Sequence, residues 1–222
     1  YKMMQVKTLR RIVFYVVTIV CNLFALYLSG SRTAWIPFVV TIPFMFLINK
    51  RFIYFTTSMA GIGGAGLLLL LEPKLMQRAT IFQDFAKRSN IWETAIKGIQ
   101  AHPLLGEGPL TYFHIYKQYH GHPTQHAHSI YLDPILSHGI IGVILAGIYF
   151  AGNLKEVYLL LKRRIDLRLF SLISAFILTI LIHGILDYTV YWVQTGLMFL
   201  IVLSASSMYF HKEQPYDIHE EH

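Results

Sequence analysis

Long blocks of apolar residues, each ending at charged or polar residues, constrain this chain more than any other feature. The six blocks are residues 12–28, 34–48, 52–71, 135–154, 169–186 and 191–210. A helix needs about 20 predominantly apolar residues to cross a bilayer, and about 17 are tolerated. Only 14% of the 222 residues are charged, whereas soluble domains have about a quarter. The sequence therefore predicts an all-α, polytopic membrane protein with about six transmembrane helices.

The apolar blocks divide the chain into four regions. Residues 1–71 are expected to form three transmembrane helices, and 72–133 a long extracytoplasmic loop with amphipathic helices. Residues 134–210 would form three more transmembrane helices, followed by a cytoplasmic tail at 211–222. This arrangement places most short, cation-rich ends in the cytoplasm, as the positive-inside rule requires. The chain opens on Tyr1, so we also expect further N-terminal helices of the same protein to precede it.

The formal net charge of +7 does not indicate a nucleic-acid partner, because the cations cluster at the ends of the apolar blocks. The single cysteine, Cys21, lies within an apolar block and supports neither a disulfide framework nor a thiolate metal site. We therefore expect a membrane environment, no nucleic acid and no cofactor.

The polar insertion contains two predicted helices. Apolar residues recur at helical spacing over residues 73–86, which indicates an amphipathic surface helix. Asn90 with Glu93 three residues later is a capping-box pattern, and it predicts a second helix that starts at Asn90 and stops before Pro103. Asp133 is expected to cap the transmembrane helix that follows the insertion.

Two arginines on the predicted outer face are candidate anion ligands. Arg88 lies two residues before the predicted helix start, where free N–H groups and the helix dipole favour anions. Its guanidinium would add a permanent charge with two parallel donors. Arg32 lies in Ser-Gly-Ser-Arg-Thr at the outer end of a predicted hairpin, close to the hydrocarbon. The alternatives are an Arg88 that is solvated or paired with Asp84, and an Arg32 that marks the membrane edge.

Five histidines gather in the second half of the insertion. They are His114, His120, His122, His126 and His128. Three chemistries fit them: a metal site, a pH sensor, or one general base placed against an acceptor hydroxyl. His126 and His128 face one side if the segment is extended and nearly opposite sides if it is helical. His128 precedes a predicted spanning helix and so has the most fixed position, whereas His120 and His122 fit an ordinary polar loop.

His183 and Asp187 are four residues apart and share one face near the outer end of the fifth apolar block. Ionisable residues in spanning segments are functional by default. The pair either supports a site or holds helices together, and the sequence leaves both interpretations open.

Several short motifs occur in a fixed order along the chain. They are Ser-Arg at the hairpin end, Arg-x-x-Ile-Trp-x-x-Ala from Arg88, Pro-Leu-x-Gly-x-Gly from Pro103, and His128 followed by Ile-Tyr-Leu and Gly-Ile-Ile-Gly. Their order and spacing, from about Ser29 to Asp187, resembles the O-antigen ligase and polymerase family. The resemblance implies the C-terminal half of a GT-C-like transferase fold.

The resemblance also implies a function in the bacterial cytoplasmic (inner) membrane. Members of the family take a glycan from undecaprenyl diphosphate and pass it to a glycan or lipid acceptor, or in some branches to a protein hydroxyl. Arg32 and Arg88 would bind the donor diphosphate, and His128 would act on the acceptor hydroxyl, without a metal. The residues expected to support this site are His126, Ser129, His183 and Asp187. Two fixed cations would stabilise the charge that develops on a diphosphate leaving group, and direct attack on the anomeric carbon would invert it.

Two positions depart from the family pattern. Ser129 stands where asparagine is common after the histidine, and His138 where an acidic residue is common before Gly-x-x-Gly. They weaken an assignment to the lipopolysaccharide ligase branch but leave the fold expectation unchanged. The alternative function is a histidine-rich membrane transporter or sensor that binds a metal such as zinc through His120, His122 and His126.

Overall fold

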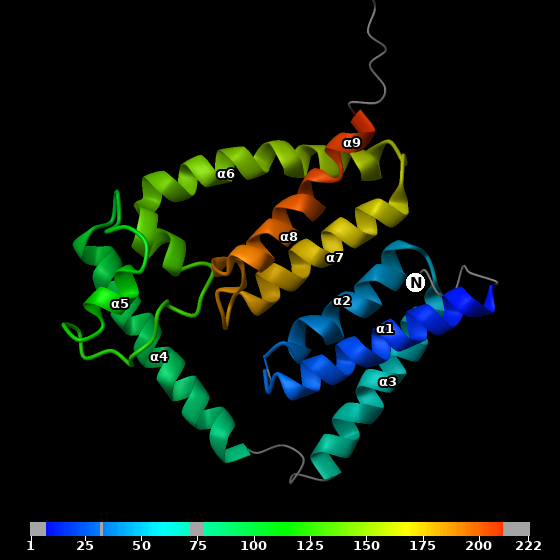
Figure 1. The fold of residues 1–222 in the computed structure, drawn as a ribbon, viewed down its shortest axis with the longest axis horizontal. Coiled ribbons are helices and arrows are strands. Elements are labelled where there is room, and N and C mark those ends of the chain that lie inside the picture. The colour runs from blue at the N-terminus through cyan, green and yellow to red at the C-terminus, as the bar shows by residue number, and fades with distance from the viewer. Residues whose placement is uncertain (1–7, 32, 72–77, 211–222) are drawn as a thin grey trace, which may run out of the picture. The chain divides into compact units, whose positions relative to one another are not determined.

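The computed structural model describes residues 8–31, 33–71 and 78–210, and within these ranges every regular element is a helix (Figure 1). In chain order the helices are α1 (Leu9–Leu28), α2 (Trp35–Ile48), α3 (Phe52–Leu71), α4 (Arg78–Ala101), α5 (Thr111–Ile115), α6 (Asp133–Lys162), α7 (Leu167–His183), the short 3-10 helix η3 (Thr189–Tyr191), α8 (Val193–Ser204) and α9 (Ser207–Phe210). The all-α prediction is therefore confirmed for the described chain.

Two helices of the described chain, α1 and α6, have the length and composition to cross a membrane. Four further apolar helices, α2, α3, α7 and α8, contain shorter apolar stretches of 10–17 residues. α1 belongs to a first compact unit, Tyr1–Ile36, and exposes apolar side chains such as Phe14, Val20 and Phe24. These features agree with a helical membrane protein, while the expected number of six spans stays a prediction.

The second compact unit comprises the rest of the chain, and one of its cores joins α6, α7 and α8. Leu160 of α6, Ile173 of α7 and Leu203 of α8 are buried in this core. Figure 1 shows α7 and α8 side by side below α6. Asn49, which follows α2, donates from Nδ2 to Ser171 Oγ of α7 at 2.7 Å. α2 is thereby fastened to the bundle.

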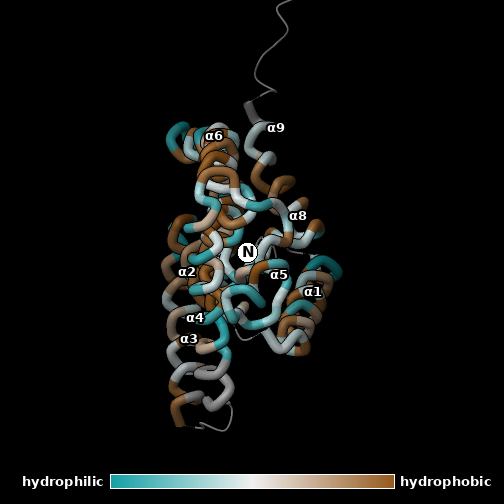
Figure 2. The backbone as a smooth tube through the Cα atoms, turned by 90° about the vertical axis from the view of Figure 1, so that its left-hand side faces the viewer, coloured by the Kyte–Doolittle hydropathy of each residue, from teal (hydrophilic) through white to brown (hydrophobic). Residues whose placement is uncertain are grey.

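A second core lies where α4, α5 and the first turns of α6 meet. Ile91 and Ala95 of α4, Tyr112 and Ile115 of α5, and Leu136 of α6 are buried there. Figure 2 shows the backbone around α5 as mainly hydrophilic and most of α6 as hydrophobic. α6 therefore connects an apolar bundle with the polar insertion.

The insertion differs from the prediction in its longest helix. α4 runs without interruption from Arg78 to Ala101, so the expected helix start at Asn90 is wrong. Glu93 pairs with Lys97 one turn later at 2.7 Å instead of closing a capping box. The side chain of Asn90 instead forms hydrogen bonds with the loop before α6. Of the expected surface helix at 73–86, residues 78–86 belong to α4 and residues 73–77 lie outside the described part of the chain.

A break in α6 fixes how the insertion meets the bundle. Gly139 has φ 65° and ψ −177° within this helix, close to its start. The N–H groups of the next residues therefore face outward, and the loop after α4 satisfies them. Ile140 N–H donates to Pro103 O at 2.9 Å, and Ile141 N–H donates to Leu104 O at 3.2 Å. In return, Gly108 N–H donates to a carbonyl of α6, that of residue 137, at 2.8 Å.

Glycine is required on both sides of this junction. A Cβ added at Gly139 would lie 2.1 Å from Leu104 O, and one added at Gly106 would lie 2.6 Å from Ser137 O. Both glycines also have positive φ, where side chains are strained. The Pro-Leu-x-Gly-x-Gly and Gly-Ile-Ile-Gly motifs thus form one interlocked backbone junction.

Candidate functional site

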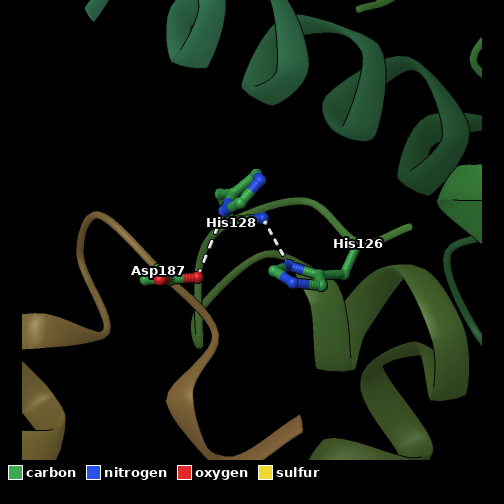
Figure 3. A group of neighbouring side chains, drawn as sticks. All are labelled: His126, His128 and Asp187. Carbon is green, nitrogen blue, oxygen red and sulfur yellow. Dashed lines mark hydrogen bonds and ion pairs between the residues drawn. The ribbon is translucent and has the colours of Figure 1, made fainter. Parts of the chain in front are cut away.

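His128 lies in the loop between α5 and α6 and makes hydrogen-bond contacts through both ring nitrogens. Nδ1 is 3.1 Å from Asp187 Oδ1, and Nε2 is 3.2 Å from Thr124 Oγ1. Asp187 follows α7 and is 59 residues away in sequence. Figure 3 shows the side chains of His128 and Asp187 directed toward each other, with His126 beside them. The side chains of His128 and Asp187 are 29% and 32% exposed, so a substrate can reach them.

The charge of Asp187 sets the tautomer of His128. Burial would raise the pKa of Asp187, but hydrogen bonds from His128 and from Tyr188 N–H, together with nearby positive charge, lower that pKa to about 2. An ionised carboxylate only accepts hydrogen bonds, so Nδ1 of His128 is the donor. In neutral His128 the lone pair is then on Nε2, where the Thr124 hydroxyl donates. This arrangement suits a general base acting on a hydroxyl group.

His126 supports the backbone of His128. Its Nδ1 accepts the His128 N–H at 3.2 Å, and the two rings are 4.4 Å apart, centre to centre. The ring of Tyr191 lies 4.8 Å from that of His126. His126 is 6% exposed, and burial, with a smaller effect of charge on His128, lowers its pKa to about 4. A neutral ring nitrogen is therefore available near neutral pH to hold His128 at its left-handed φ of 46°.

The loop after His128 is held by Ser129 and Asp133, in roles that differ from the expected ones. α6 begins at Asp133 itself, so the expectation that Asp133 caps this helix is wrong. Its buried carboxylate instead accepts the Ala127 N–H. Ser129 Oγ accepts the N–H groups of Tyr131 at 3.3 Å and Leu132 at 3.4 Å. Ser129 therefore supplies the side-chain acceptor at the start of α6.

Two further contacts attach this loop to the end of α7. Ile130 N–H donates to Gly184 O at 2.8 Å, and the Tyr131 hydroxyl donates to Leu181 O at 3.0 Å. A Cβ at Gly184 would lie 2.3 Å from Ile130 Cγ2, so the approach is close. These contacts bring the segment after α7, which carries Asp187, within reach of His128.

α4 holds the other side of the loop. Asn90 Oδ1 accepts the His122 N–H at 2.6 Å, and its Nδ2 donates to His120 O at 3.4 Å. Trp92 Nε1 donates to His128 O at 3.5 Å. Sequence reasoning did not single out Asn90, Trp92 or Thr124 as site residues. Trp92 belongs to the Arg-x-x-Ile-Trp-x-x-Ala motif. For Thr124, the one signal in the sequence is its position four residues before His128.

Arg88 lies on α4 one turn before Trp92, which places both on one face of the helix. It is half-buried and interacts electrostatically with His183, the last residue of α7. α7 ends at His183, so the expectation that His183 and Asp187 share one face of a helix is wrong, although the Asp187 N–H still donates to His183 O at 3.0 Å. The structure therefore brings Arg88, His183, Asp187 and His128 into one region. The expected helix N-terminus beside Arg88 is absent from α4 as described, so any anion binding here depends on the guanidinium.

The remaining predicted residues are placed less closely. Arg32 lies outside the described residues, so its expected convergence with Arg88 and His128 stays a prediction. The side chains of His120 and His122 are exposed, and only their backbone atoms meet Asn90.

Within the described chain, the three side chains that could hold one metal ion are His126, His128 and Asp187, with ligand atoms within 4.8 Å of one another. The expected alternative set of His120, His122 and His126 is not formed.

An apolar cavity adjoins the site between α6 and α8. Its volume is about 460 Å³, and its lining includes Ile130, Pro134, His138, Phe150, Tyr188 and Phe199. Ile130 follows His128 by two residues and Tyr188 follows Asp187 directly. The cavity therefore extends from the polar loop into the apolar bundle.

Comparison with known proteins gives one match. The model of the family described as O-antigen ligase matches residues 17–147, more than half of the chain. The matched region contains Arg88, His128 and the α6 junction, and ends before Asp187. Neither the curated proteins nor the solved structures gave a match.

Proposed function

The chain belongs to the O-antigen ligase family, and we propose from this premise that it transfers a glycan from undecaprenyl diphosphate to an acceptor hydroxyl. The observation that supports this proposal most directly is the His128 arrangement: Asp187 holds Nδ1, and Nε2 faces a hydroxyl at 3.2 Å. A base in this position needs no further group to orient it. The reaction takes place at the outer face of the bacterial cytoplasmic membrane, where the insertion lies against the headgroups.

His128 acts on the acceptor. The acceptor hydroxyl displaces the Thr124 hydroxyl at Nε2 and attacks the anomeric carbon, while its proton passes to Nε2. The bond between the anomeric carbon and the phosphate oxygen breaks, and undecaprenyl diphosphate leaves. Asp187 stabilises the imidazolium that forms. A single displacement of this kind inverts the anomeric configuration.

Arg88 acts on the donor. Its guanidinium, on the same side of α4 as Trp92, pairs with diphosphate oxygens as negative charge builds up on the leaving group. Arg32 provides the second cation of this site. Because Arg88 lies inside α4 and not at a helix end, the charge is local to the side chain and a lysine would only partly replace it.

The apolar cavity between α6 and α8 accommodates part of the isoprenoid chain. Its lining is apolar apart from the polar groups of His138 and Tyr188, and it begins next to the loop that carries the base. A lipid tail in the cavity would keep the diphosphate near the membrane surface, at the level of Arg88. Six transmembrane helices form the frame that holds these parts at the outer face.

Complementation tests the proposal. The full gene carrying His128→Ala, Arg88→Ala or His120→Ala is expressed in a strain from which the gene has been deleted, and surface glycans are analysed. We expect the first two variants to lose polymer assembly while remaining in the membrane at normal levels. His120→Ala is the matched control, because its exposed side chain can be removed while its backbone contact to Asn90 stays. Near-normal polymer from both His128→Ala and Arg88→Ala would refute the mechanism.

The same strains separate ligation from polymerisation. A ligase defect leaves long polymer that is not attached to its acceptor, whereas a polymerase defect leaves single repeat units. If wild-type protein restored neither phenotype, the proposed glycan transfer would itself be wrong.

A further inference from the structure

We propose that His126, His128 and Asp187 form a binding site for a divalent transition-metal ion such as Zn²⁺, and that the bound ion switches off glycan transfer. The binding part stands on geometry alone, while the inhibition rests on the proposed function of His128. Two imidazoles and one carboxylate are a ligand set that zinc accepts in proteins. The site differs from a loop of exposed histidines because its three residues come from the α5–α6 loop and from the segment after α7.

The distances suit such an ion. Ligand bonds of about 2.0–2.2 Å to zinc place tetrahedral ligands about 3.3–3.6 Å apart. His128 Nδ1 and Asp187 Oδ1 are already 3.1 Å apart, and the three ligand atoms lie within 4.8 Å of one another. Closing the widest gap requires a movement of about 1.2–1.5 Å, which side-chain rotation of His126 or Asp187 provides. A fourth position stays open for water.

The surroundings keep the ligands together without a metal. Ile130 is bonded to Gly184, which fixes the His128 loop against the end of α7. His126 is buried and packs against the ring of Tyr191. Little chain ordering is therefore needed when the ion binds, and a preformed site binds more tightly than a mobile one.

A metal at this position removes the base. In the metal-free site the proton of neutral His128 is on Nδ1, directed at Asp187, and the lone pair is on Nε2. When the ion takes the Nδ1 lone pair, that proton moves to Nε2, so no net proton is released from this ring. Nε2 then donates and can no longer accept the proton of the acceptor hydroxyl. The ion also takes the carboxylate that stabilises the imidazolium.

Equilibrium dialysis of the purified full-length protein with ZnCl₂ tests the binding. We expect one Zn²⁺ per chain for wild type, and at least about 100-fold weaker binding for His126→Ala and for Asp187→Asn, because loss of an outer-shell partner alone costs up to about 100-fold. The double variant His120→Ala/His122→Ala is the matched control and should bind as wild type does. Co²⁺ in place of Zn²⁺ should give the visible absorption of a tetrahedral site. Unchanged zinc binding by both ligand variants, or loss of binding in the control, would overturn the site.

Transfer assays then test the inhibition. Wild type and the double control should lose transfer at one equivalent of Zn²⁺ and regain it with EDTA. The residual transfer of His126→Ala should not respond to the same zinc concentration. Stoichiometric binding with unchanged or increased transfer would overturn the inhibition. Absence of transfer by wild type in EDTA would instead count against the proposed function. The metal site would then still be tested by the dialysis result alone.

Discussion

Replacement of Asp187 by asparagine tests the site most directly. Asp187 Oδ1 contacts both His128 Nδ1, at 3.1 Å, and the Tyr188 N–H, at 2.8 Å. An asparagine can keep its carbonyl oxygen in this position, so the loop should stay in place. The substitution removes the negative charge that stabilises the protonated ring. A hydrogen bond to a charged group contributes about 1.5–3 kcal/mol, and the site is about one-third exposed, so we take about 2 kcal/mol.

A loss of about 2 kcal/mol in the transition state corresponds to roughly a 30-fold slower transfer. The assay is transfer by purified protein in detergent or vesicles, with saturating donor and a varied concentration of acceptor. The fall should appear in kcat more than in the KM for the acceptor, because the charge matters once the ring is protonated. The folded protein should elute as wild type does near neutral pH.

Glu93→Gln is the matched control for Asp187→Asn. It removes a carboxylate from the same insertion, but Glu93 is exposed and pairs with Lys97 on α4. Transfer by this variant should stay within about twofold of wild type, as expected for a surface pair. If Asp187→Asn also stayed within twofold while folding normally, Asp187 would have no part in activating His128.

Three further predictions concern the junction, the hydroxyl and the buried histidine. Gly139→Ala should lower the free energy of unfolding by about 2–4 kcal/mol, because its Cβ would meet Leu104 O at 2.1 Å. Gly147→Ala is the control, because a Cβ at Gly147 would meet open space. Equal melting temperatures of the two variants would contradict the close approach at Gly139. Thr124→Val should keep transfer within about threefold, since the acceptor displaces this hydroxyl; complete loss would show that the hydroxyl itself reacts. The pKa of His126 falls from 6.5 to about 4 in the folded protein, so the unfolded chain binds more protons between these values, and stability should fall by up to about 3 kcal/mol as pH drops from 6.5 to 4. Thermal melts of wild type and His126→Asn at pH 7 and 4.5 measure this difference, and an identical pH dependence would contradict it.

The helices were largely predictable because their apolar blocks are long. The block at 52–71 coincides with α3, and the block at 12–28 lies within α1. A long apolar run is expected to be helical, because a lipid environment requires every backbone N–H and C=O group to be hydrogen-bonded within the segment. These helices can be predicted from sequence because the residues that cause the helix lie within the helix itself.

The prediction of a helix start at Asn90 was wrong because the hydrogen-bond partner of Asn90 lies far away in the sequence. A polar residue followed by glutamate three positions later also occurs inside helices, where Glu93 can pair with Lys97 instead. In the structure the His122 N–H, 32 residues away, donates to Asn90 Oδ1 at 2.6 Å, so this oxygen is not used to cap a helix. No pattern within the segment contains that partner.

The site was predictable only in part for the same reason. The motifs indicated His128 and Arg88, and the four-residue spacing placed His183 and Asp187 together. The contact from His128 to Asp187 depends on Ile130 bonding to Gly184, which joins two segments far apart in the chain. Thr124 Oγ1 lies 3.2 Å from His128 Nε2 within a loop in which His120 and His128 have positive φ, and the apolar and polar patterns of the sequence do not predict such a loop conformation.

The broken helix explains why these distant segments meet reproducibly. α6 carries Leu136, before the break, in the insertion core and Leu160, after the break, in the bundle core, so its two segments belong to different cores. Without the break, the first turns of α6 would continue along the bundle axis and carry Ser129 and His128 with them. At Gly139 the backbone turns, and the loop at Pro103 and Leu104 supplies the two carbonyls that the second half needs. The position of the base therefore depends on a junction of glycines and backbone hydrogen bonds, and a defect there should reduce transfer because it would displace His128.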